Sequence, residues 1–192
     1  MARPALSEDR TLGDQFLIAM PAMADPNFAH TVTYLCDHGA EGALGIVVNR
    51  PLALTLGEVL AQLDLEARDP ATAAQPVYFG GPVLPERGFV LHDPVQRYDS
   101  TLCVNDRICV TTSRDILVAI AAGRGPRRVL IALGYAGWGA GQLESELGDN
   151  AWLSAPGDAD LIFELAPERR WDAAARSIGV DPARLSGAAG HA

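Results

Sequence analysis

Residues 129–146 of the chain read VLIALGYAGWGAGQLESE and carry its clearest structural pattern. The first five residues form an uninterrupted apolar run, which is typical of a buried strand. Four glycines lie between Gly134 and Gly141, with a tryptophan among them, before a segment with the apolar spacing of a short helix. Glycines in this number indicate a tight backbone where side chains would clash. Because turns from strand to helix often build ligand sites, we predict a candidate site here and a positive φ angle at one or more of Gly137, Gly139 and Gly141.

The rest of the chain reads as short strands with a few helices among them. Apolar runs bounded by Gly, Pro and Asn predict strands, at 16–20, 31–36, 43–49, 77–79, 88–92, 101–104, 107–111, 128–133, 151–153 and 161–163. Capping signals and apolar periodicity predict helices, at 55–63, 113–122, 139–147 and 167–178. The polar, alanine-rich segment 68–75 is expected to be a mobile loop. Runs of strands with occasional helices favour an α+β fold with a mainly antiparallel sheet and flanking helices.

Length and composition suit one domain. The chain has 192 residues, of which 48% are hydrophobic, enough for a sizeable core. We therefore expect a single domain over 1–192, with 1–11 as a flexible N-terminus. Charges, glycines or prolines interrupt every apolar run before it reaches the length of a bilayer, and the N-terminus lacks the order of a signal peptide. These features predict a cytoplasmic protein without a membrane partner.

The charged residues exclude several functions. All fifteen basic residues are arginine, so a Walker A lysine, a Schiff-base lysine and a lysine that carries biotin or lipoate are impossible. The formal net charge of −9 repels nucleic acid at long range, so we expect no specific nucleic-acid binding. A dinucleotide fingerprint also fails, because Glu144 stands where its third glycine belongs. We expect no cofactor.

Cysteine and histidine give no metal pattern. An odd number of cysteines, Cys36, Cys103 and Cys109, cannot all pair within one chain, and free, mostly buried thiols in a reducing cytoplasm are the simplest interpretation. Cys36 and His38 lie close in sequence, but no second Cys/His pair has a spacing typical of zinc sites. We therefore expect no metal site and structural roles for the histidines.

Strand ends rich in Gly and Pro complete the candidate pocket, because loops converge on pockets at such ends. Its predicted residues come from three segments of the chain: Asn49, Arg50, Gly80, Gly81, Trp138, Gln142, Glu144 and Glu146. In one interpretation Arg50 clamps an anion, one of the two glutamates acts as acid/base or binds a cation, and Trp138 is a flat wall. In the structural alternative, which we favour, Arg50 forms an ion pair with Glu144 or Glu146 and Trp138 belongs to the core.

Several motifs occur together in a fixed order: Asp25–Phe28, Gly45–Pro51, Phe79–Val83, Gly88–His92 and Gly134–Trp138. Together with 141–144, 150–153 and 190–192 they resemble the YqgE/AlgH family over residues 12–192. The resemblance implies a bacterial protein with a strongly bent sheet that approaches a barrel, in a largely uncharacterised family. The family's label of transcriptional regulator comes through alginate production and implies no DNA-binding motif.

Three functions follow from these observations. The first is a non-catalytic binding or regulatory protein with an unknown protein or small-molecule partner. The second is an enzyme that uses Glu144 or Glu146 as general acid/base, with Arg50 holding an anionic substrate. The third, a DNA-binding transcriptional regulator, is disfavoured by the net charge. A serine hydrolase lacks its Gly-x-Ser-x-Gly signature here.

Overall fold

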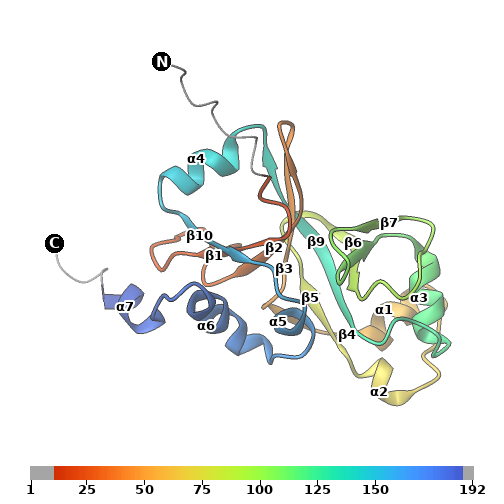
Figure 1. Ribbon diagram of the computed structural model, residues 1–192. Helices are drawn as coiled ribbons and strands as arrows, with labels where there is room; N and C mark the ends of the chain where they lie inside the picture. The colour runs from red at the N-terminus through yellow and green to blue at the C-terminus, as the bar shows by residue number, and fades with distance from the viewer. Residues whose placement is uncertain (1–10, 188–192) are drawn as a thin grey trace.

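The computed structural model describes residues 11–187, which form an α+β fold around a sheet that curls into a half-barrel (Figure 1). Its strands are β1 (Gln15–Ala19), β2 (Val32–Gly39), β3 (Gly42–Val47), β4 (Pro51–Thr55), β5 (Pro76–Phe79), β6 (Val83–His92), β7 (Thr101–Cys103), β8 (Cys109–Thr111), β9 (Val129–Gly139) and β10 (Trp152–Pro156). Its helices are α1 (Leu56–Gln62), α2 (Pro70–Ala73), α3 (Arg114–Ala121), α4 (Gln142–Gly148), α5 (Ala159–Phe163), α6 (Pro167–Ser177) and α7 (Pro182–Gly187). Within the described residues, no helix has the length and apolarity to cross a bilayer.

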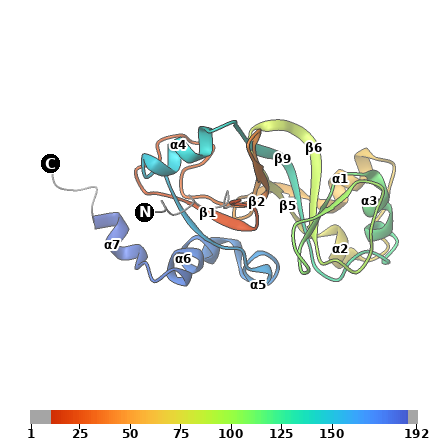
Figure 2. The same ribbon diagram turned by 45° about the horizontal axis from the view of Figure 1, so that its top comes forward.

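The sheet is mainly antiparallel, as predicted. Its strands follow the order β10-β1-β2-β3-β9-β6-β8-β7, and β4 and β5 branch from this path. The pairing of β5 with β9 is parallel, whereas the other strand pairs are antiparallel. Helices α1, α2 and α3 lie beside one half of the sheet, and α4, α5 and α6 lie beside the other (Figure 2).

Strand β9 runs through both halves and joins them. Its first part pairs with β5 through 131–133, and its second part pairs with β3 through 136–139. The pairing partner of β9 changes from β5 to β3 beside Gly80. The N–H of Gly80 donates to Leu133 O, and its carbonyl accepts from Val47 N. A Cβ atom on Gly80 would lie 2.3 Å from Gly134 O, and one on Gly134 would lie 2.3 Å from Gly81 O. The glycines therefore let two backbones cross where the sheet bends.

The glycine run is therefore a strand and not the tight turn that we predicted, since β9 continues through Gly139. A buried crossing needs glycine just as a turn does, so composition alone did not separate the two. The turn comes later, at Gly141, whose φ of 74° confirms the predicted positive angle.

Other elements differ from the prediction in ways that capping explains. Segment 68–75 holds helix α2, which begins at Pro70 and is capped by the Asp69 carboxylate through a hydrogen bond from Ala71 N. Residues 161–163 belong to α5 and not to a strand, because Asp158 accepts hydrogen bonds from the N–H groups of Asp160 and Leu161. Both aspartates are strong helix-start residues that the apolar pattern obscured. The prediction also missed α7. The expected flexible N-terminus lies outside the described residues except for position 11.

Two of the cysteines are paired, which corrects the expectation of free thiols. Cys103 on β7 faces Cys109 on β8 in the strand register, and the two form a disulfide. The strands predicted at 101–104 and 107–111 form the hairpin that brings them together, but the sequence pattern did not indicate that the two cysteines face each other across it. Cys36 stays free and buried, and burial raises the pKa of its thiol to about 12. The thiols therefore no longer argue for a reducing compartment.

Candidate functional site

Arg50 lies just before β4 and binds backbone instead of carboxylates. Its guanidinium donates to the carbonyl oxygens of Pro26, Asn27 and Ala29 at 2.8, 2.9 and 2.8 Å. The same group lies 5.6 Å from the ring centroid of Phe79. The predicted ion pair with Glu144 or Glu146 is therefore wrong, because the guanidinium donors are directed to the connection between β1 and β2.

Asn49 holds the same connection from one residue earlier. Its side-chain amide donates to His30 O, and its side-chain oxygen accepts from Val32 N, each at 2.9 Å. His30 has a positive φ of 58° and its ring stacks on Trp171 at 4.5 Å between centroids. Two consecutive side chains at the end of β3 thus fix a long connection that has no regular structure of its own.

Glu146 on α4 binds two indole groups. Its carboxylate accepts from Nε1 of Trp138 at 2.9 Å and from Nε1 of Trp152 at 2.8 Å, and it also accepts from Gln142 Nε2. Gln142 in turn accepts from Gly139 N. Trp138 is only 6% exposed, so its ring is part of the core, as the structural alternative expected.

Glu144 points to a different partner. Its carboxylate lies 2.5 Å from Nε2 of His38, whose Nδ1 accepts a hydrogen bond from Leu12 N. A hydrogen bond from its own backbone N–H, together with the one from His38, holds the pKa of Glu144 below its usual range. The carboxylate side chain is 48% exposed, so this pair is a surface interaction between α4 and β2.

Of the predicted residues, Arg50 and Glu146 are connected through aromatic rings and not through an ion pair. Phe28 lies in the connection held by Arg50, and its ring packs against Trp138 at 6.2 Å and Trp152 at 5.5 Å. These are the two indoles that Glu146 holds. Arg50, through the connection that carries Phe28, and Glu146, through the two indoles, therefore both stabilise one packed aromatic cluster.

A cavity of about 600 Å³ lies elsewhere, between α1, α3 and strands β6, β8 and β9. We call it the α1–α3 cavity. Its apolar lining comes from Leu54, Val59, Val90, Leu117, Ile131 and Leu133. Small-molecule sites are mostly apolar hollows of about 300–1,000 Å³ with a few polar groups, and this cavity has that size and character. None of the eight predicted residues lines it, because in sequence its leucines and valines look like ordinary core positions.

Arg114 is the one cation in the lining of this cavity. It is exposed at the start of α3, and its guanidinium donates to Leu63 O at 2.8 Å. Within residues 11–187 no carboxylate forms an ion pair with it. The neighbouring hydroxyl of Thr111 is occupied, since it bonds to the His92 ring and to Thr101. The lining also contains one acidic residue, Glu86, which forms no ion pair with Arg114. The cavity can therefore hold an apolar body and present the Arg114 guanidinium to an acidic end.

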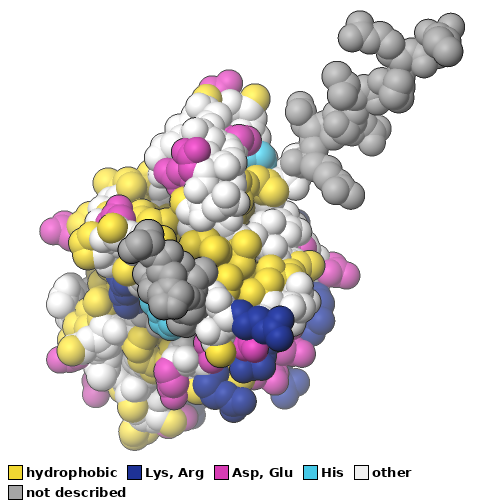
Figure 3. Space-filling view, turned by 90° about the vertical axis from the view of Figure 1, so that its left-hand side faces the viewer, with side chains coloured by type: hydrophobic (Ala, Val, Ile, Leu, Met, Phe, Trp, Pro, Cys, Tyr) yellow, Lys and Arg dark blue, Asp and Glu magenta, His cyan; other side chains and the backbone are white. Residues whose placement is uncertain are grey.

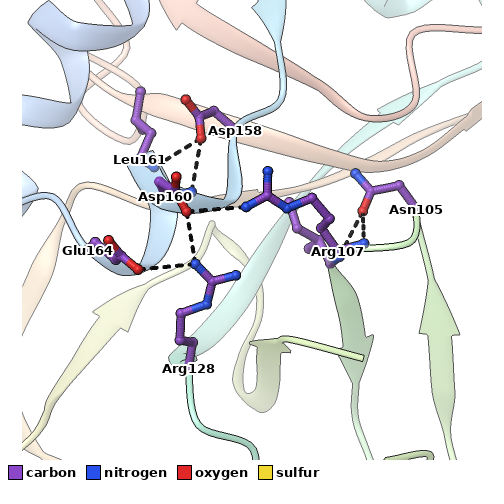
Figure 4. A network of polar contacts seen from close by, with 8 residues as sticks. Asn105, Arg107, Arg128, Asp158, Asp160, Leu161 and Glu164 are labelled. Carbon is purple, nitrogen blue, oxygen red and sulfur yellow. Dashed lines mark hydrogen bonds and ion pairs between the residues drawn. The ribbon is translucent and has the colours of Figure 1, made fainter. Parts of the chain in front are cut away.

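A larger hollow of about 790 Å³, lined partly by α5, has a charged lining. Figure 4 shows Arg107 and Arg128 reaching Asp160 from two directions, at 3.4 and 2.9 Å, and Arg128 also reaching Glu164 at 3.2 Å. These charges neutralise one another, and the two carboxylates are more than half exposed. The hollow therefore offers less to a ligand than the α1–α3 cavity. Within the described part of the chain, no three Cys, His, Asp or Glu side chains are grouped to hold a metal ion.

Comparison with known proteins agrees with the fold. The AlgH-like family model, DUF179, matches residues 16–183. A UPF0301 protein of Methylococcus capsulatus is 55% identical over 185 residues, which are 96% of this chain and 98% of the relative. A UPF0301 protein of Thioalkalivibrio sulfidiphilus is 56% identical over 179 residues, covering 93% and 96% of the two chains.

Two solved structures resemble this one. The solution structure of AlgH from Pseudomonas aeruginosa matches with a TM-score of 0.79 and 53% identity over 100% of both chains. A crystal structure of a Corynebacterium diphtheriae protein matches with a TM-score of 0.70 over 90% of both chains, but at 19% identity it shares only the fold. On the family match, the close relatives and the shared half-barrel, this chain belongs to the YqgE/AlgH family.

Proposed function

We propose that this protein is a non-catalytic binding protein whose α1–α3 cavity takes a small, largely apolar molecule with an acidic end. The observation that carries the proposal is an apolar hollow of about 600 Å³ with one arginine, free of carboxylate partners in the described structure, in its lining. Burial of an apolar body against Leu117 and Val90 supplies binding energy at about 25 cal/mol per Å². Arg114 then selects for a carboxylate, which it can bind through two parallel hydrogen bonds.

The groups considered for catalysis support this proposal by their partners. Arg50 donates to backbone carbonyls, Glu146 binds two tryptophans and Glu144 binds His38. An acid/base role needs a carboxylate that faces a substrate. Here the two carboxylates hold α4 against β2, β9 and β10.

The test is thermal unfolding with benzoate and hexanoate, each compared with its uncharged alcohol. A ligand at a hundred times its dissociation constant should add about 2.7 kcal/mol to the stability. We expect the acids to stabilise the protein more than the alcohols, and Arg114→Gln to remove that difference. Arg124→Gln, an exposed arginine outside the cavity lining, is the matched control.

A second pair of variants tests the place of binding. Leu117→Trp fills the cavity and should abolish the response to acids and alcohols alike, whereas Val95→Trp, at a position 72% exposed and outside the lining, should leave it unchanged. If no acid stabilises the wild-type protein, or if Leu117→Trp responds as the wild type does, the proposal is wrong.

A further inference from the structure

A third cavity has a lining with a charge opposite to that of the whole chain. It encloses about 270 Å³ between β5, the start of β9, α5 and α6, and we call it the Arg170 cavity. Arg127, Arg128 and Arg170 all line it, and no Asp or Glu does, although the chain carries a net charge of −9. Arginine side chains also gather unevenly on the surface, as the dark blue group at the lower right of Figure 3 shows. The volume far exceeds the roughly 30 Å³ that one water molecule takes in the liquid.

Arg170 is a buried cation that forms no ion pair within residues 11–187. Its side chain on α6 is only 4% exposed. The guanidinium donates from Nε to Leu165 O at 2.9 Å and from Nη1 to Val48 O, and it lies over the ring of Tyr78 at 5.2 Å. Removal from water lowers the pKa of Arg170, and Tyr78 and the charge of Glu168 offset this effect only in part.

Carbonyl groups satisfy donors but do not neutralise a charge, so a buried guanidinium of this kind is costly on its own. A bound anion would offset that cost. Arg128 is not available to such an anion, because its guanidinium already pairs with Asp160 and Glu164. Arg127 is available to an anion, since it is exposed, lines the cavity and forms no ion pair within the described residues.

We infer that the Arg170 cavity binds a small oxyanion, either a phosphate or a carboxylate group, between the guanidinium groups of Arg170 and Arg127. The planar fork of arginine matches the oxygen geometry of both groups. Gln75 and Tyr78, which also line the cavity, bring further polar side chains to the same place. The rest of the cavity wall includes apolar residues such as Ile162, and the volume of about 270 Å³ limits the ligand to a compact group.

The test is an NMR titration with inorganic phosphate and, separately, with acetate, each at constant ionic strength against chloride. We expect a saturable shift of the Arg170 Nε–Hε signal with at least one of the two probes. The probe that binds more tightly identifies the class of oxyanion. Absence of any saturable shift with either probe would overturn the inference.

The variants Arg127→Ala and Arg124→Ala distinguish a built site from general attraction. Both residues are exposed and close in sequence, but only Arg127 lines the cavity. Loss of one charged hydrogen-bonding partner should weaken binding about tenfold in Arg127→Ala, with unfolding midpoints unchanged in both variants. Equal weakening in Arg124→Ala would contradict the inference. Arg170→Lys keeps the positive charge but loses the planar guanidinium, and should bind the anion more weakly. If this variant does not fold, the comparison of Arg127→Ala with Arg124→Ala decides the test.

Discussion

Arg50 supplies hydrogen-bond donors to a connection that cannot supply its own. Residues 20–31 between β1 and β2 have no regular structure, so several of their carbonyl oxygens find no partner within the connection. The guanidinium of Arg50 covers three of these oxygens at once while its flat face lies near Phe79. The connection in turn positions Phe28 against Trp138 and Trp152.

Replacing Arg50 with Ala should therefore lower the free energy of unfolding by about 2–3 kcal/mol, because charged hydrogen bonds contribute about 1.5–3 kcal/mol and part of the site is open to water. Denaturant unfolding measures this directly. Arg97→Ala is the control, since Arg97 is exposed and its change should stay within about 0.5 kcal/mol. A near-neutral Arg50→Ala would show that the connection does not depend on this side chain.

Strand β9 is the element on which the bend of the sheet depends. One edge of β9 pairs with β6, while the other edge passes from β5 to β3 near Gly134. The exchange brings the backbones of Gly80 and Gly81 into direct contact with β9. It also separates the core around α1 and α3 from the core around Trp138.

Gly134→Ala should disrupt this crossing. Gly134 has a φ of 76°, and an added Cβ would meet the carbonyl oxygen of Gly81, a backbone atom that cannot swing aside. A strained φ costs about 1–3 kcal/mol and a forced contact costs a similar amount, so we expect a loss of about 2–6 kcal/mol. Gly88→Ala on β6 is the matched control, because its Cβ would meet nothing within 4 Å. Equal stability of the two variants in urea would refute the account of the crossing.

The two halves of the molecule share strand β9 and one apolar cluster, which joins Tyr78 and Leu91 to Tyr34 and Trp171. In Figure 1, β9 runs from the half with α1, α2 and α3 to the half with α4, α5 and α6. All three tryptophans, Trp138, Trp152 and Trp171, pack in the second half. The core beside α1 and α3 contains none of them.

We propose that the halves unfold together as one domain, because neither can release β9 without breaking the ladder of the other. Tryptophan fluorescence reports one half, whereas far-ultraviolet circular dichroism reports helices and strands of both. The two signals should therefore give the same midpoint in denaturant, the mark of two-state unfolding. A fluorescence transition separated from the circular dichroism transition would show two independent units.

Local patterns accounted for much of the secondary structure. The capping box at Thr55 and Glu58 begins α1 as predicted, with both hydrogen bonds formed. Pro167 starts α6, and Gly179 follows its end with a φ of 76°. These predictions were reliable because each depends on residues within one helical turn.

The candidate site was harder to predict, because its contacts join residues far apart in the chain. Arg50 and Glu146 carry charges that suggested an ion pair, yet their partners are the carbonyls of 26–29 and two indoles. The α1–α3 cavity gave no signal, since an incompletely filled core and a filled one have the same apolar pattern. Only packing distinguishes them.

The sequence by itself determined the family, the α+β class and the absence of lysine chemistry, because motif order, periodicity and composition are properties of the chain alone. Tertiary structure decided that the glycine run is a strand crossing, that Cys103 pairs with Cys109, and which arginines lack a carboxylate partner within the described residues. The physical reason is distance: close approach of two backbones, two sulfur atoms or two charges is set by how strands are paired, and strand pairing joins segments that local sequence does not connect.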